Sequence, residues 1–550
     1  MNDLRIIPLG GMGHVTKNMF LYEYGQDRII VDCGIGFPEA DMLGVDFLIP
    51  DISYLKGKEN SVKAILLTHG HDDHIGGLPY ILPELPSNIP VYGSRLTLGF
   101  TQDTLKDFQQ TANLQEIPAG IFNIGPFIVD QINITHSVPD SRHFVFKTPA
   151  GIIYHGSDYK IDFSPVDKKY MDLQKIAWYG KQGIDLLMID CLRVEKKGFS
   201  SSESSLKEVF EREIADCRGR FIVTTMSSNI HRIQQAVDVA SREQRKIAFM
   251  GRSIEENIRT ATRLGYFNLP QQKIINRKKI GKVQASQLAL IVAGSQGQSG
   301  SALDKLANRQ NKNVQIQSGD KIVFSTDVIP GNENYYYALI DNLSKLGAEV
   351  SYYDILDDLH VSGHASRGEQ ELMLNLIKPK YIVPIGGTFR HMIHYQNMAV
   401  ALGFKEEKMF LLEDEQSLLM SRGKVGLGAK VALKTIIVDG LGIGDVGKVV
   451  LGDRRKMADD GIVVIVLTVD SKNKQLLADP EIITRGFVYV RKSRDFISSL
   501  VEEVRMLLPA GGRVAVDFNK IKEGIIIHLE KYIIKETERS PMILPVLIEI

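Results

Sequence analysis

The amino-acid sequence predicts an α/β protein in which a strand-rich domain is interrupted by an α/β insertion and followed by a small α+β domain. Three observations support this prediction. Short apolar runs dominate the first 150 residues, helical periodicity begins after residue 200, and strand-like runs return near the C-terminus. The chain has 550 residues, 44% of them hydrophobic, which is enough to bury several cores.

The first part of the strand-rich domain consists of apolar runs that end at Gly, Pro or Asp. Runs of this length with turn-forming residues at their ends are typical of strands. The predicted strands are residues 4–9, 28–31, 64–67, 128–134, 144–146 and 151–154.

The middle of the chain changes pattern after the serine-rich stretch 200–205. Four apolar residues between Leu206 and Ile214 fall on one helical face, and strands then alternate with helices up to about residue 350, which indicates an α/β region. Residues able to ligate metal become rare here and return at His360, so we interpret the region as an insertion. Its predicted strands are 221–225, 289–292 and 321–324, and its predicted helices are 232–242, 254–265 and 334–346.

The last region, from about Met457, predicts a separate small α+β domain. Its predicted elements are strands at 462–469, 486–490 and 543–550 and a helix at 496–508. The expected boundaries are 1–200 and 356–430 for the interrupted domain, 201–355 for the insertion, 431–457 for a linker and 458–550 for the last domain.

Composition excludes several classes of protein. Lys and Arg together number 66, as do Asp and Glu, so a polyanion would have to be held by a local cleft. Cys33, Cys191 and Cys217 form no C-x-x-C pair, which argues against a disulfide framework or a thiolate zinc site. The chain lacks an apolar run of about 18 residues and a secretion signal, so we expect a cytoplasmic protein without a membrane anchor.

The strongest chemical signal is the segment 68–77, Thr-His-Gly-His-Asp-Asp-His-Ile-Gly-Gly, directly after a predicted strand. His69, His71, Asp73 and His74 leave one strand end together. Imidazole nitrogen and carboxylate oxygen suit zinc or manganese, and four such groups on a tight loop can face two adjacent metals. We favour this interpretation over an exposed polar loop with chance histidines.

Further candidates also follow predicted strands. His136 and Asp158 would each be an ordinary turn residue if alone, but together with the first cluster they favour metal ligation, because side chains at strand ends converge at one sheet edge. Asp32 either accepts a hydrogen bond from a ligand histidine or is a turn aspartate. In the segment 359–365, small residues and a hydroxyl would let backbone amides approach a phosphate while His364 meets the scissile group; an ordinary loop is the alternative.

One motif is set aside. Gly442, Gly444 and Gly447 match the dinucleotide fingerprint G-x-G-x-x-G, which must open a helix after a strand. Because the following residues 448–451 predict a strand, we reject a nucleotide cofactor.

The order of these segments resembles the ribonuclease J family. The segments that carry the resemblance are Thr68-His69-Gly70-His71-Asp72-Asp73-His74, Thr135-His136-Ser137-Val138-Pro139-Asp140-Ser141, Gly156-Ser157-Asp158-Tyr159-Lys160 and His360-Val361-Ser362-Gly363-His364. Further similar segments are Ser228-Asn229-Ile230-His231-Arg232, Gly294-Ser295-Gln296-Gly297, Ile329-Pro330-Gly331-Asn332-Glu333, 485–491 and Pro541-Met542-Ile543-Leu544-Pro545. The resemblance therefore covers essentially the whole chain.

The resemblance implies a metallo-β-lactamase αββα sandwich interrupted by a β-CASP insertion. It also implies a small C-terminal domain through which subunits associate, as a homodimer or homotetramer or with a paralogous subunit. The implied substrate is RNA. The implied activity is 5′-to-3′ exonucleolytic degradation, with endonucleolytic cleavage in addition, in RNA decay and rRNA maturation.

The resemblance also assigns roles to residues of this chain. His69, His71 and His136 would hold one divalent metal ion, Asp73 and His74 a second, and Asp158 would bridge both. The ions would be Zn²⁺, with Mn²⁺ or Mg²⁺ as alternatives, and would activate a water for attack on phosphorus. Asp73 would accept the proton of this water, and His364 would stabilise the transition state or protonate the leaving oxygen. The residues expected to bind substrate are Asn229, His231, His360, Val361, Ser362, Gly363 and His364.

The chain departs from the family pattern after the predicted strand 381–385. The family typically has a histidine there, in a run like Pro-Val-His-Gly-Glu, whereas this chain has Gly386. Three protein ligands still hold a metal, but we expect weaker occupancy of the second site. His391 or His394 would be substitutes, although a helix beginning near Phe389 would point them elsewhere.

Three functions therefore stay open. The first is an active two-metal ribonuclease, which the intact run 69–74 favours. The second is a weakly active or non-catalytic RNA-binding subunit of a hetero-complex. The third is another hydrolase on the same fold, such as a thioesterase, a lactonase or a DNA nuclease.

Overall fold

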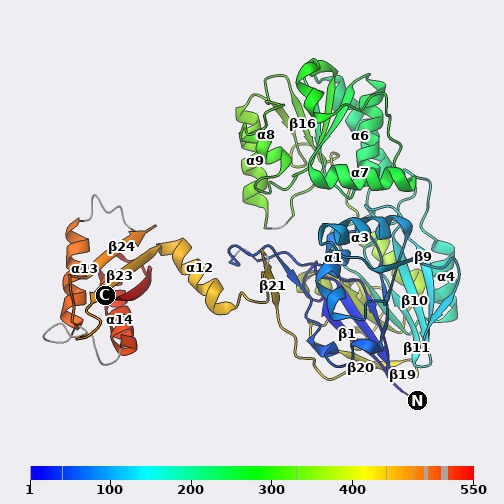
Figure 1. Ribbon diagram of the computed structural model, residues 1–550. Helices are drawn as coiled ribbons and strands as arrows, with labels where there is room; N and C mark the ends of the chain where they lie inside the picture. The colour runs from blue at the N-terminus through cyan, green and yellow to red at the C-terminus, as the bar shows by residue number, and fades with distance from the viewer. Residues whose placement is uncertain are drawn as a thin grey trace. The chain divides into compact units, whose positions relative to one another are not determined.

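The computed structural model describes residues 2–39, 41–329, 331–440, 442–473, 475–487, 494–508 and 518–550 (Figure 1). The chain forms two compact units. The first comprises Met1–Phe37 with Leu48–Ile436, and the second comprises Pro38–Phe47 with Ile437–Ile550. Among the described residues, no helix combines the length and the apolar character needed to span a membrane.

Two sheets form the centre of the first unit. In sheet order, the eight strands of the first sheet are β20 (Lys424–Leu427), β19 (Leu418–Ser421), β1 (Leu4–Gly10), β2 (Met19–Tyr24), β3 (Asp27–Val31), β5 (Val62–Leu66), β6 (Pro90–Gly93) and β7 (Asn113–Glu116). The six strands of the second are β18 (Tyr381–Ile385), β12 (Leu186–Asp190), β11 (Gly151–His155), β10 (Arg142–Thr148), β9 (Phe127–Asn133) and β8 (Phe122–Ile124). In each sheet, strands from before the third sheet of the chain therefore pair with strands from after it.

The side chains of β5 show why these strands pack as layers. Successive residues of a strand point to opposite faces. Accordingly, Ala64 and Leu66 belong to the core that the two sheets share, whereas Ile65 and Leu67 belong to the core on the other face of the first sheet. Because both faces are covered, the segment is a continuous apolar run rather than an alternating one.

Helices cover the outer faces of the sandwich, which confirms the predicted αββα arrangement. Those packed on the first sheet include α2 (Leu78–Ile81) and α3 (Arg95–Asp107). Those packed with the second sheet are α4 (Leu173–Gln182), α10 (Arg367–Ile377) and α11 (Phe389–Ala401). The single-turn helix α1 (Asp72–Ile75) carries part of the predicted metal segment.

Between β12 and β18 the chain forms a third sheet, entirely parallel, coloured green in Figure 1. Parallel strands need crossover helices, and these supply the alternating pattern seen in the sequence. The strands in sheet order are β14 (Lys246–Met250), β15 (Leu288–Val292), β13 (Phe221–Thr224), β16 (Lys321–Phe324) and β17 (Glu349–Ser351). The helices are α5 (Leu206–Ala215), α6 (Ile230–Arg242), α7 (Arg252–Leu264), α8 (Ala302–Ala307) and α9 (Glu333–Lys345).

The second unit has its own α+β core, as predicted. Its elements are α12 (Lys448–Asp460), β23 (Ile462–Val469), β24 (Glu481–Arg485), α13 (Arg494–Leu507), α14 (Phe518–Thr537) and β25 (Met542–Glu549). Alternate residues of β23 are buried against α13 and α14. The described part of the predicted strand 486–490, Gly486 and Phe487, is not strand, because β24 ends at Arg485; residues 488–490 lie outside the described part of the chain.

The predicted strand at 448–451 is also wrong, because these residues begin α12. The strong helix formers that follow allow a helix to propagate back through Val449 and Val450. A helix therefore does follow Gly447, contrary to our reason for rejecting the fingerprint. The preceding strand β22 (Gly442–Ile443), however, pairs with β21 (Ile436–Asp439) in an antiparallel hairpin, whereas the fingerprint requires a parallel βαβ unit.

Truncating Leu66 tests the two-sheet core. Its side chain is fully buried between the sheets, so Leu66→Ala should lower the free energy of unfolding by about 2–5 kcal/mol. Urea unfolding followed by the fluorescence of Trp178, the single tryptophan of the chain, measures this change. Leu427→Ala is the matched control, because Leu427 lies in the same sheet and is 63% exposed; a change beyond about 0.5 kcal/mol there would contradict the assignment.

Candidate metal centre

The polar residues of the site follow parallel strands whose carboxyl ends meet. Strands β3 and β5 run parallel; Asp32 comes directly after β3, and His69 is the third residue after the end of β5. Strands β11, β12 and β18 also run parallel, with Asp158 after the first, Asp190 at the end of the second and Gly386 after the third. Parallel strands of one sheet end at the same edge, which brings residues distant in sequence together.

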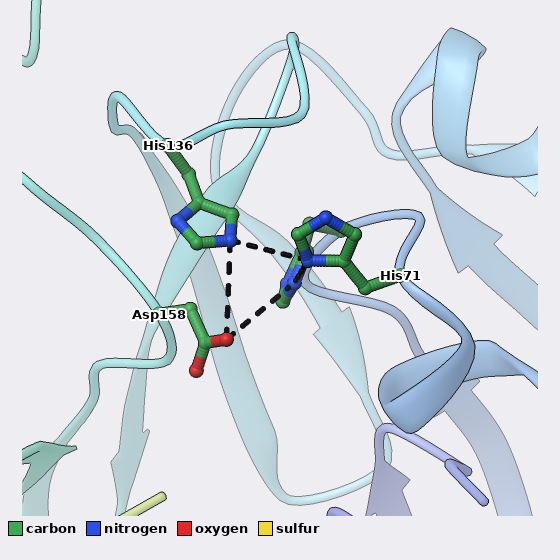
Figure 2. Close-up of side chains that lie close together, drawn as sticks. His71, His136 and Asp158 are labelled. Atoms are coloured by element: carbon green, nitrogen blue, oxygen red, sulfur yellow. Dashed lines mark hydrogen bonds and ion pairs between the residues drawn. The ribbon is translucent and has the colours of Figure 1, made fainter. Parts of the chain in front are cut away.

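Asp158 is at the centre of the cluster. Its Oδ2 atom lies 3.5 Å from Nε2 of His74, 3.8 Å from Nε2 of His69 and 3.9 Å from Nε2 of both His136 and His364. Figure 2 shows His71 and His136 with Asp158, from three separate segments. Two groups of side chains therefore offer donor atoms close enough for one ion each and share Asp158; they are His69, His71, His136 and Asp158, and Asp73, His74 and Asp158.

The first group has the protonation state that a metal requires. Burial lowers the pKa of His71 to about 3 and the pKa values of His69 and His136 well below their usual range, so their imidazoles are neutral at pH 7. Burial would raise the pKa of Asp158, but His74 and His364 outweigh it and keep this pKa well below the usual range. Neutral imidazole and carboxylate are the ligand forms for zinc or manganese, so the residues fit divalent ions.

Outer hydrogen bonds fix the histidine rings. His74 donates from Nδ1 to Oδ2 of Asp32 (2.7 Å), and Asp32 also accepts bonds from the backbone and hydroxyl of Thr68. His136 donates from Nδ1 to the carbonyl oxygen of Gly363 (2.7 Å). Each bond occupies Nδ1, so Nε2, which faces Asp158, is the nitrogen that each ring would offer to a metal.

Asp190 was not predicted from the sequence as a site residue. This buried carboxylate accepts a hydrogen bond from Nδ1 of His364 (2.8 Å), and Asp158, Asp190 and His364 form a third group of convergent donor atoms. Burial would lower the pKa of His364, but Asp190 and Asp158 raise it to about 9. The available signal was its position at the end of an apolar strand, like the other site residues.

Position 386 faces the same centre. A Cβ atom built on Gly386 would lie 3.4 Å from Oδ1 of Asp190 and 3.7 Å from Oδ1 of Asp158, so a side chain here would enter the site. His391 does not take its place, because it hydrogen-bonds Thr388 at the start of α11. His394 lies 3.2 Å from Glu195 instead.

The predicted substrate residues join the insertion to the centre. Asn229 is buried and caps α6 through Arg232 N (3.3 Å), and His231 lies 3.6 Å from Asp167. The buried Arg232 donates to Glu203, to Ser325 O and to Val361 O, and its NH1 contacts Nδ1 of His360. Ser362 Oγ accepts from the amide of His364 (3.1 Å).

A pocket adjoins the metal cluster, with His136 in its wall. The wall also contains His231 of the insertion, Glu203, and residues of the loop that runs from Asp162 to Lys169. The pocket thus lies between one candidate metal ligand, His136, and His231 at the N-terminus of α6.

Comparison with family models defines the class first. A metallo-β-lactamase superfamily model matches residues 12–155, and a model described as a Zn-dependent metallo-hydrolase RNA specificity domain matches 354–409. A solved structure of a protein of unknown function from Enterococcus faecalis V583 superposes on 78% of this chain and all of its own, with a TM-score of 0.54 and 13% identity, which supports the fold alone. The fold and the histidine cluster are those of a metallo-β-lactamase hydrolase.

The family follows from matches over the whole chain. Models of the ribonuclease J β-CASP domain and C-terminal domain match residues 218–343 and 449–550. The chain is 37% identical to ribonuclease J2 of Bacillus subtilis, 36% identical to ribonuclease J 1 of Streptococcus pyogenes and 34% identical to ribonuclease J 2 of Staphylococcus aureus. Each match covers 100% of this chain and 98–99% of the relative. The chain belongs to the ribonuclease J family.

Removing the outer carboxylate should weaken metal binding. Asp32→Asn keeps the size of the side chain and tolerates the positive φ of 60° at this position, but it loses the charge that orients His74. We expect Zn²⁺ affinity, measured by competition with a chelating dye, to fall about 10- to 100-fold. Asp27→Asn, at the partly exposed start of β3, is the control; equal affinity of both variants would contradict the role of Asp32.

Arg232→Ala tests the coupling of the insertion to the 360–364 segment. It leaves the carboxylate of Glu203 buried without its partner, which should lower the free energy of unfolding by about 3–5 kcal/mol in urea titrations. Arg242→Ala removes an exposed arginine from the same helix and should cost less than about 1 kcal/mol. Equal costs would show that the buried network adds nothing.

Proposed function

We propose that this protein hydrolyses phosphodiester bonds of RNA by two-metal catalysis, mainly as a 5′-to-3′ exonuclease and also as an endonuclease. The observation that carries the proposal is the shell of histidine Nε2 atoms around Oδ2 of Asp158. In this proposal His69, His71 and His136 would hold one ion, Asp73 and His74 would hold the other, and Asp158 would be shared by both. The ions would be Zn²⁺, or alternatively Mn²⁺ or Mg²⁺.

Bound divalent ions would supply a water that is acidic enough to react at neutral pH, and positive charge opposite the phosphoryl oxygens. Asp73 is suited to accept the proton of the attacking water, because burial raises the pKa of its carboxyl. His364 is suited to the opposite role. Asp190 holds its Nδ1 and stabilises the protonated ring, so Nε2 donates to a phosphoryl or leaving oxygen.

Substrate binding falls to the segment His360, Val361, Ser362, Gly363 and His364. Arg232, which belongs to the insertion, contacts this segment at Val361 and His360. RNA contacts made by the insertion would therefore help to position the scissile phosphate. We assign Asn229 and His231 to the same surface, because His231 lines the pocket beside His136.

The remaining assignments complete the proposal. Residues 1–200 and 356–430 form the catalytic domain, 201–355 the β-CASP insertion, 431–457 a linker, and 458–550 a domain that joins subunits into dimers or tetramers. The physiological setting is RNA decay and rRNA maturation in the cytoplasm.

A second function has one observation in its favour. Gly386 provides no side chain at a position that faces Asp158 and Asp190. If the second ion is lost as a result, the chain would act as an RNA-binding subunit beside an active paralogue.

The test combines metal analysis with degradation of 5′-labelled RNA. Wild-type protein should bind close to two ions and release labelled mononucleotide. His71→Ala and Asp73→Ala should each lower the rate about 100-fold or more, because an ion that stabilises the transition state by several kcal/mol is lost or misplaced. His394→Ala is the control, because its ring contacts Glu195 outside the cluster.

Full-length RNA surviving with every metal tested, while RNA binding is retained, would overturn the proposed activity. That result would favour the function as a partner subunit.

A further inference from the structure

Two exposed phenylalanines lie side by side near the site. The side chains of Phe163 and Phe199 are 62% and 53% exposed, and their ring centroids are 6.2 Å apart. They come from different segments, the loop after Asp158 and the loop after β12. We call this pair the Phe163–Phe199 platform. Large apolar rings exposed as a pair indicate a binding surface more than chance exposure does.

The platform is held in place by its surroundings. The amide of Arg367 donates to Lys196 O, and the amide of Gly368 donates to Gly198 O, both at 2.8 Å, which ties the loop before Phe199 to the start of α10. A Cβ atom on Gly368 would come within 2.8 Å of the Phe199 ring, so glycine allows this close packing. Fixed backbone therefore presents the ring to solvent.

Positive charge accompanies the platform. Lys196 and Lys197 are exposed, three and two residues before Phe199. The intervening acid of this loop, Glu195, is turned toward Arg390 and His394, which offset its charge. Closer to the metal centre, Arg193 has a buried Nε that forms no hydrogen bond with the described residues. The loop after β12 thus carries cations from the centre outward to the platform.

The platform is also connected to the catalytic segment. Ser200, next to Phe199, donates from Oγ to His364 O (2.8 Å). Asp162 and Pro165, which flank Phe163, line the pocket that His136 also lines. A strand whose phosphate lies at the metal centre is therefore within reach of the two rings.

We propose that the Phe163–Phe199 platform stacks bases of a single-stranded RNA segment outside the metal centre, while Lys196 and Lys197 bind its phosphates. The inference rests on the proposed function, because it takes RNA as the substrate. Aromatic rings accept any base, so the platform binds single strands without sequence preference. A paired duplex hides its base faces and is bound more weakly. The two lysines complement the negative charge of RNA phosphates, and the rings complement its bases. RNA is therefore favoured over a protein partner as the occupant.

The experiment measures binding without hydrolysis. Fluorescein-labelled 20-nucleotide single-stranded RNA is titrated by anisotropy against full-length protein in a chelator, which prevents cleavage. Loss of stacking in Phe163→Ala/Phe199→Ala should raise Kd about 5- to 100-fold, and should abolish the quenching of 2-aminopurine placed in the strand. Lys196→Ala/Lys197→Ala should flatten the dependence of log Kd on log salt by about 1.4, twice the slope for one phosphate contact.

Phe108→Ala is the matched control, because Phe108 is 44% exposed and packs on Tyr80 outside both segments. Unchanged RNA affinity in the platform variant, or the same loss in the control, would overturn the proposal. A changed oligomeric state with unchanged RNA affinity would also overturn it and identify a protein interface. None of these binding measurements requires RNA cleavage, so they stay valid even if the protein does not hydrolyse RNA in the earlier test. Each proposal can therefore fail without the other.

Discussion

The carboxylate of Asp158 is the constraint on which the rest of the site depends. It is buried, and burial alone would favour its neutral form. Four imidazole Nε2 atoms lie within 3.9 Å of its Oδ2 atom, and two of these rings, His74 and His364, make the charged form the stable one. A buried carboxylate shared by two groups of donor atoms is suited to bridging two cations. Each histidine ring around it then needs a second hydrogen-bond partner to fix its orientation, as Asp32 does for His74.

The fold provides this arrangement through its strand ends and through the insertion. Two sheets packed face to face bring the carboxyl ends of β5 and β11 together, although the residues they carry lie far apart in sequence. The insertion contributes differently. Its buried Arg232 hydrogen-bonds the segment that carries His364, so the position of the insertion and the geometry of the catalytic segment are coupled. Movement of one would be expected to disturb the other, since a buried ion pair tolerates little displacement.

Much of this could be predicted from the sequence, because the strongest signals were local. The segment from His69 to His74 follows a strand, and the strands of the first domain, the α/β insertion and the final α+β unit appear as hydrophobic periodicities, whereas the αββα sandwich was implied by the family resemblance. The failures were of two kinds. The start of α12 contains three apolar residues, Val449 to Leu451, which predicted a strand, but cooperative helix formation by the residues that follow outweighs this local preference. Asp190 was missed because its role depends on His364, a residue distant in sequence. Helix α14 was also not predicted.

The number of metal ions that this site binds despite Gly386 tests the proposed two-metal centre most directly. Crystals grown with Mn²⁺ and measured for anomalous scattering would locate the ions. We predict two peaks about 3.5–4 Å apart on either side of the Asp158 carboxylate, the stronger beside His69, His71 and His136, the weaker beside Asp73 and His74. A single peak at the histidine-rich group, with no anomalous signal beside Asp73 at saturating Mn²⁺, would contradict it and show that the missing side chain at position 386 abolishes the second site.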